Sequence, residues 1–104
     1  MTTIEKLQVL LKTEIKKYKG YEIKAQTKRI YCVDGAHASI QASETHYCTP
    51  QDNHGPYTHV EIWCIGDIGN IPITHFEYDE NEPSAYVPIE AVAAFLDDHG
   101  GIAP

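Results

Sequence analysis

The chain has 104 residues, of which 42% are apolar and 22% charged, and a formal net charge of −7. This composition is that of one globular domain rather than of a disordered or multidomain protein. No apolar run approaches the ~18 residues that span a bilayer, and charges interrupt the apolar N-terminal positions, so neither a membrane span nor a signal peptide is expected.

Three cysteines, an odd number in a chain without a secretory signal, indicate reduced thiols and a cytoplasmic location. The charges are unevenly distributed along the chain. Residues 1–29 hold all eight Lys and Arg and three acids, which gives +8 − 3 = +5. Residues 30–104 hold the other twelve of the fifteen acids and no Lys or Arg, which gives −12. The sequence therefore predicts an electrically two-sided protein.

The first predicted element is an amphipathic helix, because apolar residues recur at helical spacing from Ile4 to Tyr18. Thr2 and Glu5 have the spacing of a capping box, and Gly20 is expected to cap the C-terminus. The lysines near that end suit the negative end of the helix dipole.

Alternating apolar and polar residues predict four strands, over residues 21–33, 36–48, 57–65 and 71–79. Asp34–Gly35 is a two-residue hairpin signal, and the turn-rich segments 49–56 and 66–70 separate the later strands.

Residues 87–101 predict a second helix, which begins at Pro88 and ends at Gly100–Gly101. Its buried stripe is expected to consist of Ile89, Val92, Ala93 and Leu96. We therefore expect one α+β domain over residues 1–104. It has a helix at each end, an antiparallel meander of four or five strands between them, and both helices on one face of the sheet.

Strand register follows from closing the hairpins symmetrically, which we do around residues 53 and 68. His46 then lies opposite Val60, Glu61 opposite His75, and His59 opposite Glu77. One face is expected to form the core: Ile23, Ala25, Tyr31, Val33, Ile40, Ala42, Val60, Ile62, Cys64, Phe76 and Tyr78. The other face is expected to be open: Tyr47, Tyr57, His59, Glu61, Trp63, Ile65, Ile73, His75 and Glu77.

The segment from His46 to Cys64 is rich in histidine and cysteine, which raises the question of a metal site. In this register Cys48 and Cys64 lie about six strand positions apart, near 20 Å at ~3.3 Å per residue, so they cannot share a metal. The spacing matches no zinc-finger pattern. The segment is interpreted as a hairpin, and no metal or other cofactor is expected.

The sharpest alternative is a square of His59, Glu61, His75 and Glu77 at adjacent cross-strand positions. These side chains have Cβ atoms roughly 5 Å apart in the predicted register and could hold a transition metal, for binding or for catalysis. The other interpretation is two exposed His–Glu pairs on the wet face of the sheet.

Two smaller sets contain nucleophilic or metal-ligating groups. His46 and Cys48 share a strand face, and Cys32 lies opposite His37 across the predicted hairpin turn; a half-buried histidine and structural cysteines explain both. The carboxylates of residues 77–82 are expected to be exposed to solvent. No phosphate-binding loop or catalytic triad signature is present, so the sequence leaves an enzyme open but favours a non-enzymatic role.

Exposed Tyr47, Tyr57 and Trp63 resemble a base-stacking platform. Acidic residues flank it, however, and would repel phosphates, so direct nucleic-acid binding is not expected. The sequence instead favours a protein-binding module whose partner has a basic surface, with aromatic anchors and acidic steering groups. The expected partner-binding residues are Tyr47, Tyr57, Trp63, Glu61, Glu77, Asp79 and Glu80.

In size and charge the chain is similar to phage-encoded anti-CRISPR and anti-restriction inhibitors and to toxin-immunity proteins. That similarity implies an inhibitor that mimics a nucleic acid and occupies the basic site of a nucleic-acid-binding protein. The alternatives are a metal-binding protein or metal-dependent enzyme that uses the square, and a structural component whose acidity serves solubility. No membrane contact is expected, and the chain is expected to be a monomer or a homodimer.

Overall fold

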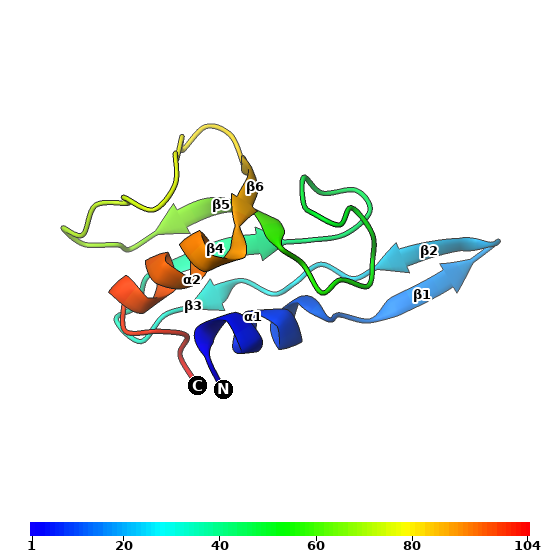
Figure 1. Cartoon of the computed structure of the whole chain (residues 1–104), viewed down its shortest axis with the longest axis horizontal. Helices are drawn as coiled ribbons and strands as arrows, with labels where there is room; N and C mark the ends of the chain where they lie inside the picture. The colour runs from blue at the N-terminus through cyan, green and yellow to red at the C-terminus, as the bar shows by residue number, and fades with distance from the viewer.

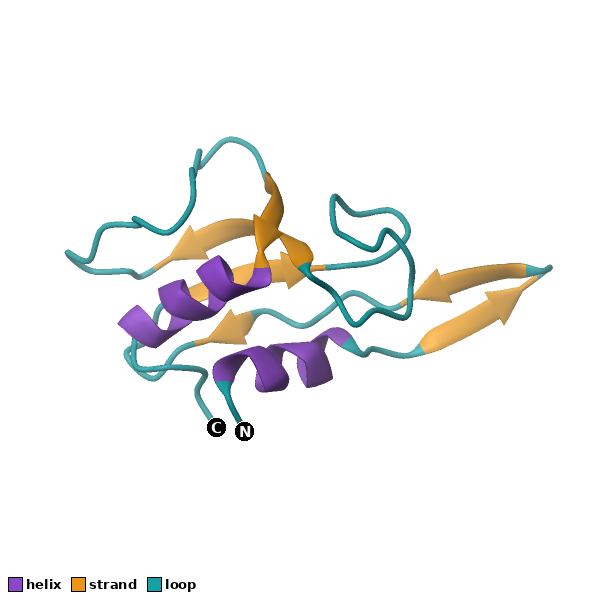
Figure 2. Ribbon diagram, in the orientation of Figure 1, coloured by secondary structure: helices purple, strands orange, loops and turns teal.

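The computed structural model describes all 104 residues and contains two helices and six strands. In chain order these are α1 (Thr3–Leu11), β1 (Ile15–Tyr18), β2 (Tyr21–Lys24), β3 (Ile30–Tyr31), β4 (His37–Gln41), β5 (His59–Gly66), β6 (Ser84–Pro88) and α2 (Ile89–Asp98). Strands β3 to β6 form an antiparallel meander, and β1 pairs only with β2 (Figures 1 and 2). This confirms the α+β class with an antiparallel sheet. Neither helix has the length and apolar character needed to cross a bilayer.

The first helix is shorter than predicted. The capping box of Thr2 and Glu5 is present, but α1 ends at Leu11. The chain then extends, and residues 15–18 pair with residues 21–24. Lys19 and Gly20 have φ values of +49° and +84°, as the centre of a type I′ hairpin turn requires. Gly20 is therefore a hairpin residue rather than a helix cap, and the helical spacing up to Tyr18 was misleading.

The β1–β2 hairpin, which we call the arm (residues 15–24), projects from the body of the molecule (Figure 1). Only the base of the arm is bonded to the rest of the molecule. Lys24 Nζ donates to the carbonyl of Ala42 at 2.7 Å, and Glu22 lies 3.3 Å from His54 Nε2. The predicted strand over residues 21–33 is thus two strands, of which the first leaves the main sheet.

The hairpin at Asp34–Gly35 is confirmed, but its register differs by one residue from the predicted one. Tyr31 rather than Cys32 lies opposite His37. A one-residue slip exchanges the two faces of a strand, so Ile30 and Cys32 point into the core while Tyr31 and Val33 are exposed.

The fourth strand of the sheet is not the predicted one. Strand β5 pairs with β6, with Val60 opposite Val87, and residues 67–83 form a loop. Pro72 lacks the N–H that a ladder requires, whereas β6 runs directly into α2 and buries Val87 beside the core.

The core lies between the sheet and the helices. Helix α2 packs on β5 and β6, and α1 packs on α2; the finer expectation, that both helices lie on one face of the sheet, stays a prediction. Five of the residues expected in the core are exposed: Ile23, Ala25, Tyr31, Val33 and Cys64. The largest fully buried side chains are Phe95, Leu7, Leu11, Ile40, Ile62, Leu96, His99, Val60, Val92 and Cys48.

The C-terminal tail covers the free edge of β3. The Ala103 N–H donates to the Tyr31 carbonyl at 2.8 Å, and the Val33 N–H donates to the Gly101 carbonyl at 3.0 Å. Helix α2 ends as predicted, with the Gly101 N–H bonded to the Leu96 carbonyl. Covering this edge protects it from pairing with other chains.

Candidate functional site

Three exposed aromatic side chains lie on β5, on the neighbouring β6 and on the loop that contacts β6: Trp63 from β5, Tyr86 from β6 and Tyr47 from the loop 42–58. We call them the aromatic cluster. Their exposed fractions are 37%, 49% and 55% respectively. The rings of Tyr47 and Tyr86 are 5.9 Å apart, and the Tyr86 N–H donates to the Tyr47 carbonyl at 3.0 Å. Exposed aromatic side chains of this kind are typical of binding surfaces.

The backbone near the aromatic cluster is strained. Tyr86 has φ +51° and Cys64, next to Trp63, has φ +54°. Bulky residues rarely adopt positive φ, and such strain persists where surrounding contacts over-determine the conformation. The register between β5 and β6 also shifts between Val60 and Ile62. These irregularities change the direction in which side chains leave two adjacent strands, as bulges near binding sites do.

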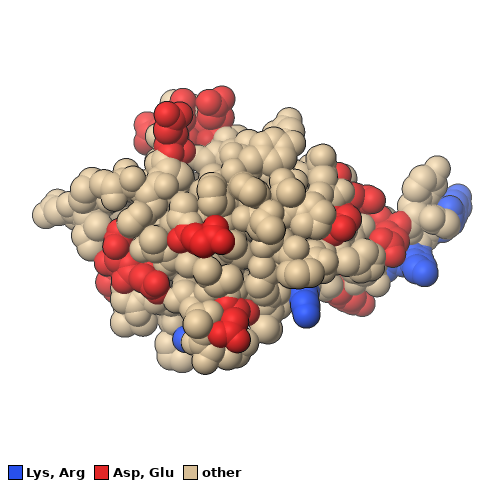
Figure 3. All heavy atoms as spheres, viewed as in Figure 1, with Lys and Arg blue, Asp and Glu red and all other residues tan.

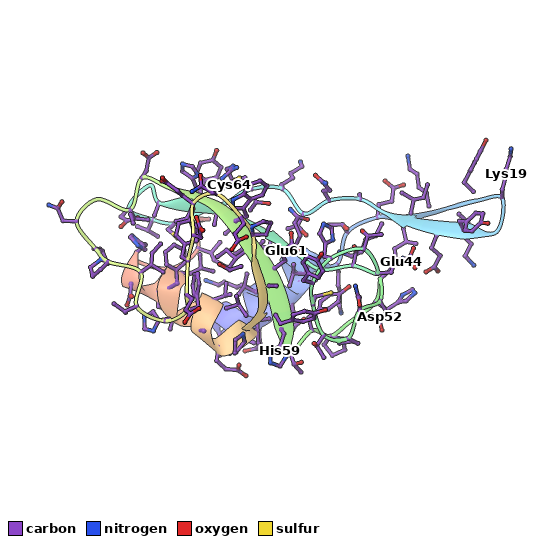
Figure 4. The ribbon with its side chains drawn as sticks, turned by 90° about the horizontal axis from the view of Figure 1, so that it is seen from above. Lys19, Glu44, Asp52, His59, Glu61 and Cys64 are labelled. Atoms are coloured by element: carbon purple, nitrogen blue, oxygen red, sulfur yellow. The ribbon has the colours of Figure 1, made fainter.

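Glu61 positions the cluster rather than presenting a free charge. Its Oε2 accepts the backbone N–H of Tyr47 at 3.1 Å, which ties the loop 42–58 to β5. Figure 4 shows His59, Glu61 and Cys64 following one another along β5. The predicted partner-binding role of Glu61 is thus an indirect one, through Tyr47.

A pocket opens beside the cluster, between β6 and the loop before it. We call it the acidic pocket, and it encloses about 620 Å³. The residues that line it include three acids and two tyrosines: Glu77, Asp79, Glu82, Tyr78 and Tyr86. Figure 3 shows a group of carboxylates on the loop that precedes β6. The pocket therefore combines negative charge with aromatic walls.

The pocket's loop is fixed mainly by backbone and ring contacts. Ser84 Oγ donates to the Glu77 carbonyl at 2.9 Å, and the Trp63 indole N–H donates to the Glu80 carbonyl at 3.3 Å. Asp79 Oδ1 accepts the Asn81 N–H at 2.8 Å. The Glu77 and Glu82 carboxylates make no hydrogen bond or ion pair within the chain, so they are free to bind a cation.

The Lys and Arg side chains of residues 1–29 do not form salt bridges with the acidic side chains of residues 30–104. All four close contacts between an acid and a base involve histidine: His37–Asp67, His54–Glu22, His75–Asp98 and His99–Asp34. No Lys or Arg forms a salt bridge with a carboxylate. Figure 3 shows cationic side chains on the arm, and carboxylates spread over the rest of that face, including the side next to the arm.

The predicted square of two histidines and two glutamates does not form. His59 lies opposite Pro88 rather than Glu77, and His75 Nε2 lies 2.8 Å from Asp98 Oδ2 on α2. No group of three or more His, Cys, Asp or Glu side chains is placed to hold a metal ion. The square required residues 71–79 to pair with β5, and the β5–β6 pairing removes it.

Tyr57 is not a surface anchor, which corrects the prediction. It is 3% exposed, its hydroxyl donates to the Asp52 carbonyl at 2.9 Å, and burial raises the pKa of that hydroxyl to about 12. The Gln8 side chain bonds both the N–H and the carbonyl of Tyr57. Tyr57 therefore joins the loop 42–58 to α1.

The predicted pairing of Cys32 with His37 is also absent, because Tyr31 takes the position opposite His37. Burial, together with the smaller effects of the Asp34 and Asp97 charges, raises the pKa of Cys32 to about 11. Cys48 is 1% exposed, and burial is the largest cause of its raised pKa. Nucleophilic cysteines need a low pKa and access, so neither thiol is placed for catalysis.

His46 bonds to Ser43 rather than acting with Cys48. Ser43 Oγ lies 2.6 Å from His46 Nδ1 and also accepts the Thr45 N–H, while Cys48 Sγ donates to the Ser43 carbonyl. Ser43 is 4% exposed. The set is a buried polar network that folds the loop, and it offers no open nucleophile.

A second pocket, of about 450 Å³, lies between the end of α1, the segment 25–30 and the C-terminal tail. Arg29, on its rim, is already bonded to the Cys64 carbonyl at 2.7 Å and to His37. The remaining lining is largely apolar and of mixed charge, so it specifies no ligand chemistry.

Sequence reasoning missed Tyr86 and Glu82, since residues 80–86 lie between the predicted strand 71–79 and the predicted second helix and were assigned to neither. A signal was present: Tyr86 and Val87 are strand-favouring residues directly before Pro88. Comparison with protein-family models, with curated proteins and with solved structures finds no match.

Proposed function

We propose that this chain is a protein-binding module whose acidic pocket and aromatic cluster together bind a basic surface of a partner protein. The observation that carries the proposal is the pocket of about 620 Å³, whose lining includes Tyr86 and two acidic residues without a partner in the chain, Glu77 and Glu82. The cluster adjoins it, so charge and aromatic area form one continuous surface.

The pocket's chemistry suits a cationic side chain, and arginine best of all. A planar guanidinium bonds carboxylates in bidentate fashion and also stacks on aromatic faces. Glu77 and Glu82 supply the carboxylates, and Tyr78 and Tyr86 supply the rings.

The remaining surface would steer the encounter. Residues 30–104 carry −12, and complementary charge speeds association more than it adds affinity. Tyr47, Trp63 and Tyr86 would then supply the buried contacts that slow dissociation.

The partner class that fits is a protein with a cluster of Arg and Lys, such as a nucleic-acid-binding site. Occupying that site would block it, which is how small acidic inhibitors resembling this chain in size and charge act. All three cysteines are free, which suits a reducing compartment, and we therefore propose that the protein acts in the cytoplasm.

The proposal is tested with a fluorescent arginine-rich peptide and anisotropy titrations at low salt. The variant Glu77→Lys/Glu82→Lys removes the free carboxylates of the pocket. Its matched control, Glu14→Lys/Glu44→Lys, makes the same change in net charge at exposed positions that do not line the pocket. We expect the pocket variant to bind roughly tenfold more weakly than the control, ~1.4 kcal/mol. Equal weakening by both variants would show that only net charge matters and would contradict a specific pocket.

A further inference from the structure

We propose that the arm of one molecule docks into the acidic pocket of a second copy, which makes the protein self-associate head to tail. The inference rests on the acidic pocket of the proposed function and names a further occupant for it. It follows from the charge, the exposed residues and the position of the arm.

The arm carries unpaired cations and exposed aromatic rings. Lys16, Lys17 and Lys19 are exposed and form no salt bridge within the chain. Tyr18 and Tyr21, on either side of the turn, are 62% and 74% exposed. The arm thus presents the ammonium and aromatic groups that complement the carboxylates and rings of the pocket.

The arm's strands have open edges but are poorly suited to pair with each other across two copies. Strands β1 and β2 pair only with one another, so each leaves one edge free. Lysines on exposed edges oppose edge-to-edge pairing, and two arms would bring like charges together. The docking surface for the arm must therefore be acidic.

Within one molecule the arm cannot reach the pocket. The molecule measures 48 × 29 × 19 Å, and the arm lies at one end of its long axis while the loop before β6 lies towards the other (Figures 1 and 3). Figure 4 shows Lys19 at the tip of the arm, far from β5. Docking of arm into pocket is consequently possible only between molecules.

Such a contact is heterologous when two molecules share one arm–pocket contact, because the other arm and the other pocket then stay free for further copies. Heterologous contacts lead to rings or open chains rather than to a closed pair. A second copy in the pocket would also compete with a basic partner, so self-association would hold the partner-binding surface covered until the partner displaces the arm.

Sedimentation velocity over a range of protein concentrations, at low and at high salt, tests the inference. We expect the wild-type protein to form species larger than a monomer at low salt and to dissociate at high salt. The arm variant Lys16→Glu/Lys17→Glu/Lys19→Glu and the pocket variant Glu77→Lys/Glu82→Lys are each expected to remain monomeric. A control with the same charge change outside the arm, Lys6→Glu/Lys12→Glu/Lys28→Glu, should still associate.

The decisive step is to mix the two variants. An acidic arm then meets a basic pocket, and a basic arm meets an acidic one, so the mixture should recover association that neither variant shows alone. A wild-type protein that stays monomeric at low salt overturns the inference. So does a wild-type protein whose arm binds a DNA duplex instead of a second copy.

The same samples separate this inference from the proposed function. If the wild-type protein stays monomeric but still binds the arginine-rich peptide through the pocket, self-association is contradicted and the proposed function is not. Protein that associates through the arm and pocket but does not bind the peptide supports self-association and contradicts the proposed function.

Discussion

Two long loops flank the aromatic cluster, and they use their polar residues in opposite ways. The loop 42–58 buries two of its polar side chains: Ser43 and Asn53 are each 4% exposed, and Asn53 Oδ1 accepts the Glu44 N–H. The loop 67–83 turns its carboxylates outward, and Glu77 and Glu82 have no partner within the chain. Buried polar groups must be bonded inside the fold, whereas exposed charges are left for other molecules.

The difference separates a loop that stabilises from a loop that binds. Substitutions of the buried residues of the first loop should lower stability and leave the binding of folded protein unchanged, whereas Tyr47, which is exposed on that loop, belongs to the binding surface. Substitutions in the second should weaken binding and leave stability nearly unchanged.

The largest effect is expected at Tyr57, which is buried against the core. Tyr57→Ala should lower the free energy of unfolding by about 3–5 kcal/mol, while the folded protein still binds the arginine-rich peptide. Tyr57→Phe removes only the bond to the Asp52 carbonyl and should cost about 0.5–1.5 kcal/mol. Urea unfolding measures both; a Tyr57→Ala protein of wild-type stability would contradict the assignment of this loop as structural.

Trp63 lies between the two loops and should affect binding more than stability. Trp63→Ala removes a 37% exposed ring and should weaken peptide binding by ~2 kcal/mol, mainly through faster dissociation. Trp63→Phe keeps a ring but loses the indole bond to Glu80, so it serves as the intermediate control. Stopped-flow dissociation rates check the prediction, and unchanged rates in Trp63→Ala would remove Trp63 from the interface.

The smallest effect concerns pH and Asp52 in the stabilising loop. The N–H groups of Gly55 and His54, in that order, lower the pKa of the Asp52 carboxyl. A group with a lowered pKa in the folded state stabilises above its ordinary pKa, and this contribution is lost as the pH falls through the folded pKa. We therefore expect the melting temperature to fall below about pH 4, and to fall less in Asp52→Asn. Parallel curves for the two proteins would contradict this role of Asp52.

Local signals in the sequence predicted some elements well, because each was decided by neighbouring residues. The capping box at Thr2 begins α1, Asp34–Gly35 makes a hairpin, and Gly100–Gly101 ends α2. Where a segment fitted two local structures equally well, its pairing with a distant segment determined which one formed. Residues 15–18 fit a helical stripe, yet the Lys19–Gly20 turn pairs them with β2.

The site was harder to predict than the fold, since it depends on register. Trp63 and Tyr47 were assigned to the exposed surface, as observed, because alternation along β5 and the loop composition favoured it. Tyr57 was assigned wrongly, since it precedes β5 and its orientation follows from contacts with Gln8. Tyr86 joined the site only when β6 replaced residues 71–79 beside β5. A single exchanged strand thus removed the metal hypothesis and created the acidic pocket.

The central claim is that the acidic pocket binds a cationic side chain of a basic partner. Amide chemical shifts of the ¹⁵N-labelled protein test it most directly, followed during titration with the arginine-rich peptide at low salt and at a protein concentration at which the protein sediments as a monomer. The account predicts that residues 76–88 and the Trp63 indole N–H shift together and saturate, while the amides of the arm, residues 15–24, do not move. Shifts confined to the arm or to the loop 42–58, with none at residues 76–88, would contradict it.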